Sequence, residues 1–263
     1  MKQRIITAIL ALIVFIPFVI IGKWPFTLFI YLIATIGLME LLKMRKVSII
    51  SVPGLIAVLT LWLVLMPDKS MLFPIGQFSI IDIYVVIILF LLAYTVLVRN
   101  KFTFDETAFV MLTILYVGIG FYFLIETRLG QNGLSNIIFA FLIIWATDTG
   151  AYFTGKAFGK RKLWPDISPN KTIGGAVGGI LTACLVALIF HLVQPFPHSM
   201  LIVVIVTIFA SIIGQIGDLV ESALKRTYGI KDSGSILPGH GGILDRFDSL
   251  LFVIPFLHII HFI

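Results

Sequence analysis

The chain concentrates its ionisable side chains in one segment, residues 221–248, which hydrophobic stretches border on both sides, at 201–219 and 249–263. Charged side chains at membrane depth are costly and usually functional. Carboxylates, basic groups and an imidazole within one short segment could together hold a metal ion and bind phosphate. The ionisable residues of this segment are Glu221, Lys225, Arg226, Lys231, Asp232, His240, Asp245, Arg246 and Asp248.

A polar stripe runs along the hydrophobic stretch that precedes this segment. Its members recur in steps of three and four residues, which places them on one face of an α-helix. A helix that only packs in lipid needs no carboxylate on such a face. Beyond the segment, Asp245 and Asp248 are three residues apart, so we expect them to share a helix face as well. The stripe consists of Ser211, Gln215, Asp218, Ser222 and Lys225.

Three of the acids, Asp218, Asp245 and Asp248, would concentrate negative charge if the two helices bring them together. Hard oxygen ligands suit Mg²⁺, which commonly binds one or two carboxylates together with waters and substrate phosphates. Three carboxylates also leave room for a second cation. We therefore predict a Mg²⁺ site at these aspartates. The basic residues suited to phosphate oxygens are Lys225, Arg226, Lys231 and Arg246.

A second polar region lies upstream, where Asp148 belongs to an apolar helix pattern that leads into a basic loop, residues 156–162. After that loop, Ser168, Lys171 and Thr172 come directly before a glycine-rich helix pattern. Free N–H groups at a helix start, the helix dipole and a lysine together suit an anion. A helix cap followed by a close glycine contact explains the same residues. The sequence leaves both interpretations open, and Asp148 could likewise serve only to pair with a basic residue of a neighbouring helix.

Many positions of the segment 221–248 resemble the signature of the phosphatidate cytidylyltransferase family, the CDP-diacylglycerol synthases. Segments 148–155 and 168–175 are also similar to segments of that family. The resemblance implies a membrane enzyme that joins CTP and phosphatidate, a paired-metal centre and a homodimer. The residues that carry the resemblance in the first segment are Ser222, Leu224, Lys225, Arg226, Lys231, Asp232, Gly234, Leu237, Pro238, His240, Gly241, Gly242, Asp245, Arg246, Phe247 and Asp248.

The residue types and the resemblance together give a predicted set of site residues. Those expected to act in catalysis are Asp218, Asp245 and Asp248, which would also bind the metal, with Lys225 and Arg226. Those expected to bind substrate are Asp148, Ser168, Lys171, Thr172, Ser222, Lys231, Asp232, His240, Gly241, Gly242 and Arg246.

His240 lies between glycines in a polar loop, where Gly241 and Gly242 let the backbone turn tightly and approach a ligand closely. The imidazole could be a general base, a donor to phosphate or an anchor of the loop. The attacking phosphate of phosphatidate is already ionised, so the expected reaction needs no strong base. We therefore favour contact with a phosphate or a nucleotide.

The composition indicates a membrane protein. Of 263 residues, 59% are hydrophobic and 12% are charged, which is about half the charged fraction of a typical soluble domain. Apolar runs of about 20 residues fit helices that cross a bilayer. We expect an all-α integral membrane protein, a bundle of about nine transmembrane helices, although the second and third could instead form a shorter re-entrant pair. The expected spans are residues 4–21, 26–42, 49–66, 80–98, 108–125, 134–158, 174–193, 200–225 and 243–263.

Lysine and arginine predict the orientation, because they favour the cytoplasmic side of a membrane. With nine spans and a cytoplasmic N-terminus, every Lys and Arg except Lys23, Lys69 and Arg128 falls on the cytoplasmic side. The C-terminus then lies on the opposite side, and loops 156–173 and 226–242 lie in the cytoplasm. We expect a bacterial inner (plasma) membrane enzyme with a cytoplasmic active site. The net charge of +6 fits a face turned to anionic lipid and phosphate, and the sequence shows no nucleic-acid-binding module.

The chemistry is expected in the second part of the chain. Residues 1–125 are predicted to form packing and lipid-facing helices, and residues 126–263 to form the catalytic helices. Glu40 is one of the few acids in a span of the first part. We expect it at a helix interface, with Lys43 as its near charged partner.

Two other functions fit some of these features. A CTP-dependent lipid-alcohol kinase would share a cytoplasmic nucleotide site. A cation transporter could use Asp148 and Asp218 as ligands near the middle of the membrane. The acids instead crowd towards helix ends, next to Lys and Arg, which favours cytidylyl transfer.

Overall fold

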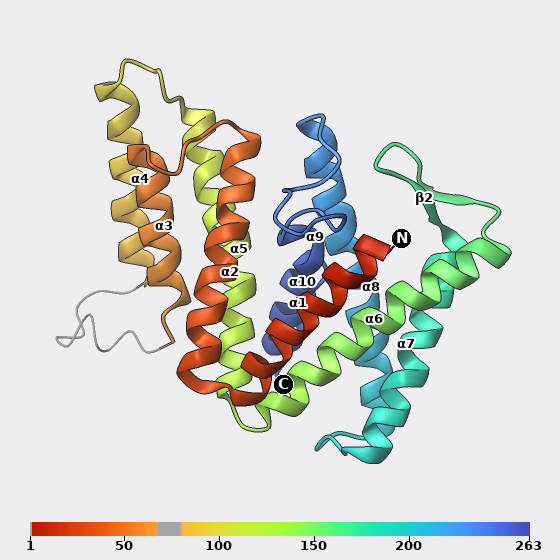
Figure 1. Cartoon of the computed structure of the whole chain (residues 1–263). Coiled ribbons are helices and arrows are strands. Elements are labelled where there is room, and N and C mark those ends of the chain that lie inside the picture. The colour runs from red at the N-terminus through yellow and green to blue at the C-terminus, as the bar shows by residue number, and fades with distance from the viewer. Residues whose placement is uncertain (1, 68–79) are drawn as a thin grey trace.

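Ten helices and a small hairpin of two strands make up the part of the chain described by this computed structural model, residues 2–67 and 80–263 (Figure 1). Lys69, one of the three basic residues expected away from the cytoplasm, lies outside these ranges. The helices are α1 (Lys2–Ile21), α2 (Lys23–Met44), α3 (Val52–Leu65), α4 (Ile80–Leu97), α5 (Phe104–Leu129), α6 (Gly133–Phe158), α7 (Ile173–Val193), α8 (Met200–Thr227), α9 (Leu244–Phe247) and α10 (Leu250–Ile259), and the strands are β1 (Lys162–Trp164) and β2 (Ser168–Thr172).

The helices confirm an all-α membrane protein. Five of them, α2, α5, α6, α7 and α8, are long and apolar enough to cross a bilayer, and shorter apolar helices lie within α1, α3, α4 and α10. Within the described ranges, an apolar helix therefore overlaps each of the predicted spans. α3 has 14 residues, a rise of about 21 Å, which is less than the ~30 Å hydrocarbon core. The number of full crossings and the orientation stay predictions.

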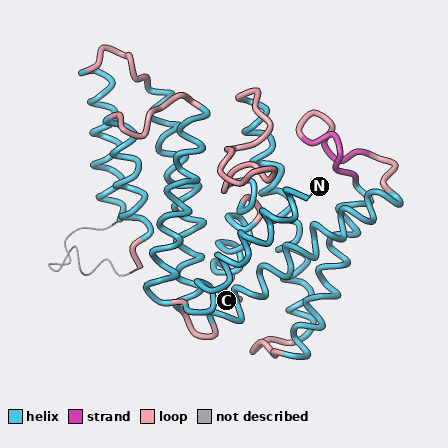
Figure 2. The backbone as a smooth tube through the Cα atoms, viewed as in Figure 1, coloured by secondary structure: helices cyan, strands magenta, loops and turns pink. Residues whose placement is uncertain are grey.

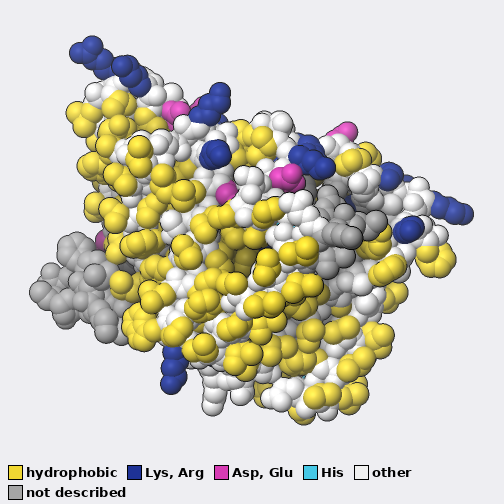
Figure 3. Space-filling model, viewed as in Figure 1, with side chains coloured by type: hydrophobic (Ala, Val, Ile, Leu, Met, Phe, Trp, Pro, Cys, Tyr) yellow, Lys and Arg dark blue, Asp and Glu magenta, His cyan; other side chains and the backbone are white. Residues whose placement is uncertain are grey.

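The helices form two groups joined by α10. α2, α3 and α4 pack around α5 in one group, and α6 and α7 pack along each other in the other. α10 contacts both α5 and α8, and α8 in turn contacts α6 and α7 (Figure 1). In the space-filling view, hydrophobic side chains cover most of the middle of the face, and basic side chains gather along its upper and right-hand edges (Figure 3). This distribution suits a bundle with one charged end.

Residues 168–172 form a strand, although the sequence suggested only a loop before a helix. β1 and β2 are antiparallel, with Lys162 opposite Thr172 and Trp164 opposite Ser168 (Figure 2). The Thr172 hydroxyl then accepts a hydrogen bond from Gly175 N at 3.1 Å and caps α7. The helix-cap interpretation is therefore confirmed for Thr172.

The expected ninth span is interrupted near its start. α9 ends at Phe247 and α10 begins at Leu250. At the interruption the Asp248 carboxylate accepts a hydrogen bond from Ser249 N at 2.7 Å. A side chain that binds a nearby backbone N–H competes with the helical ladder, so the polar pair marks the break. The hydrophobic pattern alone did not reveal this competition.

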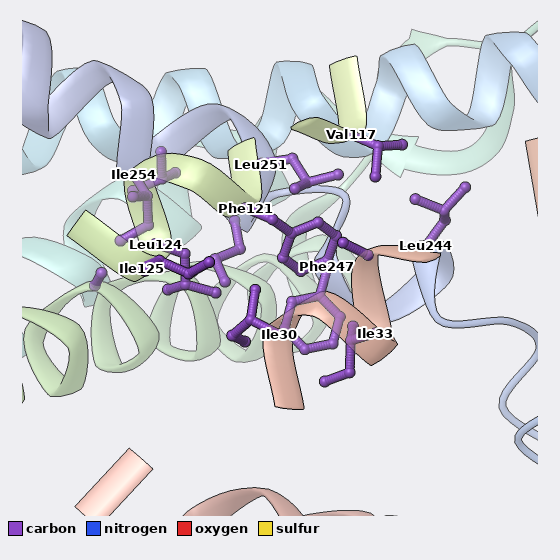
Figure 4. Close-up of a cluster of buried hydrophobic side chains, with 14 of the residues drawn as sticks. Ile30, Ile33, Val117, Phe121, Leu124, Ile125, Leu244, Phe247, Leu251 and Ile254 are labelled. Atoms are coloured by element: carbon purple, nitrogen blue, oxygen red, sulfur yellow. The ribbon is translucent and has the colours of Figure 1, made fainter. Parts of the chain in front are cut away.

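The apolar side of α9 is anchored in the core. Leu244 is fully buried and Phe247 nearly so, and the Phe247 ring centroid lies 5.3 Å from that of Phe121 in α5. Figure 4 shows both α9 side chains among residues of α2, α5 and α10. A Cβ added at Gly37 in α2 would lie 3.1 Å from the Leu244 side chain, so α2 approaches α9 closely. This packing leaves the polar side of α9 facing the charged segment.

Glycines let α6 and α7 pack closely. A Cβ at Gly179 would lie 2.7 Å from the backbone oxygen of Thr147, and a Cβ at Gly175 would lie 2.8 Å from that of Ala151. Glycine-rich helix faces can support either a dimer or packing within one chain. These glycines pack internally, so they no longer argue for a homodimer.

We predict that Gly179→Leu destabilises the protein, because the new side chain would meet backbone that cannot rotate away. The free energy of unfolding should fall by about 1–3 kcal/mol, and thermal unfolding in detergent should show a lower apparent Tm. Val177→Leu is the matched control, because Val177 is exposed on the same helix. Equal Tm values for the two variants would contradict the close packing.

Candidate functional site

The polar stripe of α8 faces other protein elements. Ser211 and Thr147 of α6 lie with their hydroxyls 2.9 Å apart. One turn on, the Gln215 amide donates to the backbone oxygen of Ala176 in α7 at 3.3 Å. The stripe thus runs along the junction of α6, α7 and α8 and leads towards the charged segment.

Asp218 lies where several elements meet. Its Oδ2 is 2.6 Å from Lys171 Nζ of β2, and its Oδ1 accepts a hydrogen bond from Ser222 at 3.3 Å. The charge of Asp218 acts on both Asp148 and Asp248. The structure therefore brings together residues that are far apart in the sequence, and Lys171 pairs with one of them, Asp218.

Lys225 is held between two carboxylates. Its Nζ lies 2.7 Å from Glu221 Oε2 and 2.5 Å from Asp245 Oδ1. Glu221 is fully buried and Lys225 is 9% exposed. A buried charge needs a partner, so we expect Lys225 to stay paired with these two carboxylates. Glu221 was not among the predicted site residues, although its spacing of four residues from Lys225 was the available signal.

Asp245 anchors the segment between α8 and α9. Its Oδ2 accepts hydrogen bonds from Ser233 N and Ser233 Oγ, both at 2.8 Å, and from Gly242 N at 2.7 Å. Gly241 has a φ of +80°, and a Cβ there would meet the Asp245 carboxylate. Both oxygens of Asp245 are therefore engaged with the chain itself.

The predicted metal residues do not form one cluster. Among the residues that the structure describes, no group of three or more His, Cys, Asp and Glu is arranged to hold an ion. Asp218 and Asp248 nevertheless lie within electrostatic range of each other and of Glu221. Glu221 Oε1 is buried without a hydrogen-bond partner, and so is Tyr116 Oη of α5. Hard oxygen ligands with an unpaired buried acceptor fit a cation such as Mg²⁺ better here than at Asp245.

A cavity of about 520 Å³ opens in the segment between α8 and α9. Thr7 of α1 contacts this segment by donating to the Pro238 backbone oxygen at 2.9 Å, and His240 Nδ1 is buried without a partner. Arg226 is absent from the lining, and its guanidinium donates to the Ile230 backbone oxygen at 3.2 Å. The lining includes five predicted substrate residues: Lys231, Asp232, His240, Gly241 and Arg246.

Glu40 of α2 also reaches this segment. Its carboxylate accepts hydrogen bonds from Ile243 N at 2.9 Å, Leu244 N at 3.0 Å and Ser233 Oγ at 3.1 Å. The expected interface position is confirmed. Among the described residues its bonds go to this segment and not to Lys43, because both oxygens point across the helix interface.

The chain is similar over its length to known cytidylyltransferases. The cytidylyltransferase family matches residues 2–263. The phosphatidate cytidylyltransferase of Bacillus subtilis strain 168 is 54% identical over 259 residues, covering 98% of this chain and 96% of the relative. Those of Staphylococcus saprophyticus and Staphylococcus aureus strain COL are each 48% identical, and each covers 99% of this chain and 98% of the relative. This chain therefore belongs to the cytidylyltransferase family.

Proposed function

We propose that the protein transfers the cytidylyl group of CTP to phosphatidate. A phosphate oxygen of phosphatidate attacks the α-phosphorus of CTP, the bond to the β-phosphate oxygen breaks, and pyrophosphate leaves with CDP-diacylglycerol as the other product. One observation carries the proposal. Half of the sixteen residues that resemble the family signature line the cavity between α8 and α9: Lys231, Asp232, Gly234, Leu237, Pro238, His240, Gly241 and Arg246. The relatives named as phosphatidate cytidylyltransferases support the same substrates.

The reaction brings two anions together, so its main demands are charge neutralisation and alignment. Lys231 and Arg246 line the cavity and supply positive charge for phosphate oxygens. His240 also lines the cavity, and we assign its imidazole to contact with phosphate or nucleotide. Lys171 supplies a further cation beside Asp218.

Asp218 and Asp248 would hold Mg²⁺ together with substrate phosphate oxygens, since Mg²⁺ commonly binds only one or two protein carboxylates. A second cation would need a further acceptor, such as the unpaired Glu221 oxygen. The metal would neutralise phosphate charge and orient phosphate oxygens. Asp245 has its oxygens on Lys225, Ser233 and Gly242, so we assign it to shaping the loop. In that role Asp245 positions Lys225 and the loop residues next to the cavity.

We further infer nine membrane crossings in a bacterial cell membrane, with the N-terminus and the active site on the cytoplasmic side. Most basic side chains of the face shown in Figure 3 lie along its upper and right-hand edges, which supports this orientation. Phosphatidate would keep its acyl chains in lipid and present its headgroup sideways to the site. The homodimer rests on the family resemblance alone.

Product analysis tests the proposed function directly. The purified protein in detergent, given α-labelled CTP, phosphatidate and Mg²⁺, should move the label into a lipid-extractable product. No label should move when phosphatidate is left out or a chelator is added. Transfer from γ-labelled CTP instead would identify a lipid kinase, and absence of lipid label from a folded sample with several acyl chains would contradict the proposal.

Asp218→Asn should lower kcat by roughly 10²-fold or more, because one charge that organises the site is lost. The protein should stay folded, since Asp218 is partly exposed to solvent and its pair with Lys171 contributes little to stability. The measurement is kcat with Tm in detergent. Asp166→Asn is the control, because Asp166 is an exposed acid between β1 and β2. Near-normal kcat for Asp218→Asn would remove Asp218 from the site.

Lys171→Ala should raise the KM for CTP or phosphatidate about tenfold, in line with the loss of one charged contact to a phosphate. Lys162→Ala provides a matched control, because Lys162 is exposed in the partner strand β1. An unchanged KM and kcat in Lys171→Ala would leave β2 with only the capping role of Thr172.

A further inference from the structure

Glu40 is a buried acid in an otherwise apolar part of α2. The residue is 7% exposed, and burying a carboxylate is costly unless hydrogen bonds compensate. Its compensation comes entirely from the segment that follows α8, through Ile243 N, Leu244 N and Ser233 Oγ. The acid therefore stabilises one particular placement of that segment against α2.

The two backbone donors lie at the start of α9. Ile243 precedes this helix and makes no side-chain cap to it. The orphan N–H groups of a helix start need acceptors, and Glu40 supplies them from a position about 200 residues earlier in the chain. Leu244 and Phe247 fix the opposite side of α9 in the core (Figure 4). Core packing and the Glu40 carboxylate thus hold the short helix from two sides.

The neighbouring glycines fit the same contact. Neither Gly234 nor Gly242 has a positive φ, so backbone conformation does not require glycine at either position. A Cβ at either one would collide with the Glu40 carboxylate, and a Cβ at Gly242 would also meet the Ser233 hydroxyl. Two glycines of the charged segment are therefore explained by the close approach of one side chain of α2.

Ser233 links Glu40 to the residues of the site. Its hydroxyl lies 3.1 Å from Glu40 Oε2 and 2.8 Å from Asp245 Oδ2, so its single proton is shared between two carboxylates. Asp245 in turn pairs with Lys225. A displacement of Glu40 would therefore reach Asp245 and Lys225 through a continuous chain of hydrogen bonds.

We infer that Glu40 is a positioning residue for cytidylyl transfer: it sets the start of α9 and, through Ser233, the place of Asp245 and its partner Lys225. This inference rests on the proposed function for its kinetic consequence. Glutamine cannot replace the acid, because an amide offers only one acceptor oxygen and directs N–H groups at the remaining donors.

The first test is Glu40→Gln in the purified full-length protein. We expect kcat for lipid labelling to fall roughly 10- to 100-fold, as for a misplaced catalytic group, with the KM for phosphatidate within about twofold of the unchanged protein. Hydrogen–deuterium exchange of the peptide 233–247 should become faster, because Ile243 N and Leu244 N lose their acceptors.

Glu106→Gln is the matched control. Glu106 Oε2 also accepts a backbone hydrogen bond at a helix start, from Thr103 N at 2.6 Å, in the capping box of α5. Glu40→Gln should lose at least as much Tm as Glu106→Gln, because Glu40 is buried and Glu106 caps an exposed helix start. Only Glu40→Gln should lose kcat per folded protein. A kcat within about twofold of the unchanged protein, or a loss that only follows the folded fraction, would overturn the inference.

A double-mutant cycle tests the geometry further. Gly234→Ala should also lower kcat, because the added methyl displaces the Glu40 carboxylate, whose side chain supplies the three nearest atoms to that position. Its effect in the Glu40→Gln background should shrink to about twofold or less, since both changes break one contact. Fully additive losses would contradict the shared contact.

A milder variant decides the case in which Glu40→Gln fails to fold. Ser233→Ala removes only the hydroxyl between Glu40 and Asp245, and it should lower kcat while the protein stays folded; unchanged kcat would overturn the inference. If the unchanged protein makes no CDP-diacylglycerol, the proposed function fails, and faster exchange in peptide 233–247 of Glu40→Gln still decides whether Glu40 holds α9.

Discussion

The arrangement of the site depends on carboxylates that bind the backbone of a segment with almost no regular structure. Between α8 and α9 the described structure has one isolated bridge, Leu237 with Gly241. Such a segment cannot hold its shape by ladder hydrogen bonds, and its exposed backbone groups would otherwise bind water. Asp245, in α9, accepts hydrogen bonds from backbone N–H groups of this segment, and Glu40, in α2, accepts hydrogen bonds from the backbone N–H groups at its end. Both acids belong to helices, so the helices fix the position of the loop through these hydrogen bonds.

The bundle supplies what these carboxylates need. α8 carries a polar stripe along its junction with α6 and α7, so its acids meet protein groups instead of lipid. The glycines of α6 and α7 let the helix pair approach closely, and β2 places Lys171 beside Asp218. Polar groups in a membrane protein persist where they satisfy one another. The same contacts that make the charged end tolerable also collect the residues expected to bind phosphate.

The sequence predicted the elements better than the contacts between them. Long apolar stretches and the steps of three and four along α8 predicted the helices and the polar face of Ser211, Asp218 and Lys225, because helical periodicity is local. The partner of Glu40 could not be predicted, since Ile243 lies about 200 residues away in the chain. Hydrophobicity also gave no sign that Asp248 interrupts the last span or that β1 and β2 pair.

The sequence also did not predict which of the nearby acids is free to bind a metal ion, as Asp245 shows. Composition indicates that acids and bases gather, but it does not show which acid already has a partner. In the structure Asp245 is engaged by Lys225 and backbone donors, whereas Glu221, which no family pattern singled out, keeps one oxygen unpaired. The choice among nearby acids depends on side-chain geometry, which the spacing along one helix does not determine.

The two lysines of the site differ in a way that suits the proposed reaction. The side chains of Lys171 and Asp218 are 26% and 32% exposed, whereas those of Lys225 and Asp245 are 11% and 6% exposed. An exposed pair contributes little to stability and can exchange partners at small cost. A buried pair is costly to break, because removing either member leaves an uncompensated charge. Lys171 is therefore the lysine that can turn from a carboxylate to an incoming phosphate, and Lys225 is the one that keeps the loop in place while this happens.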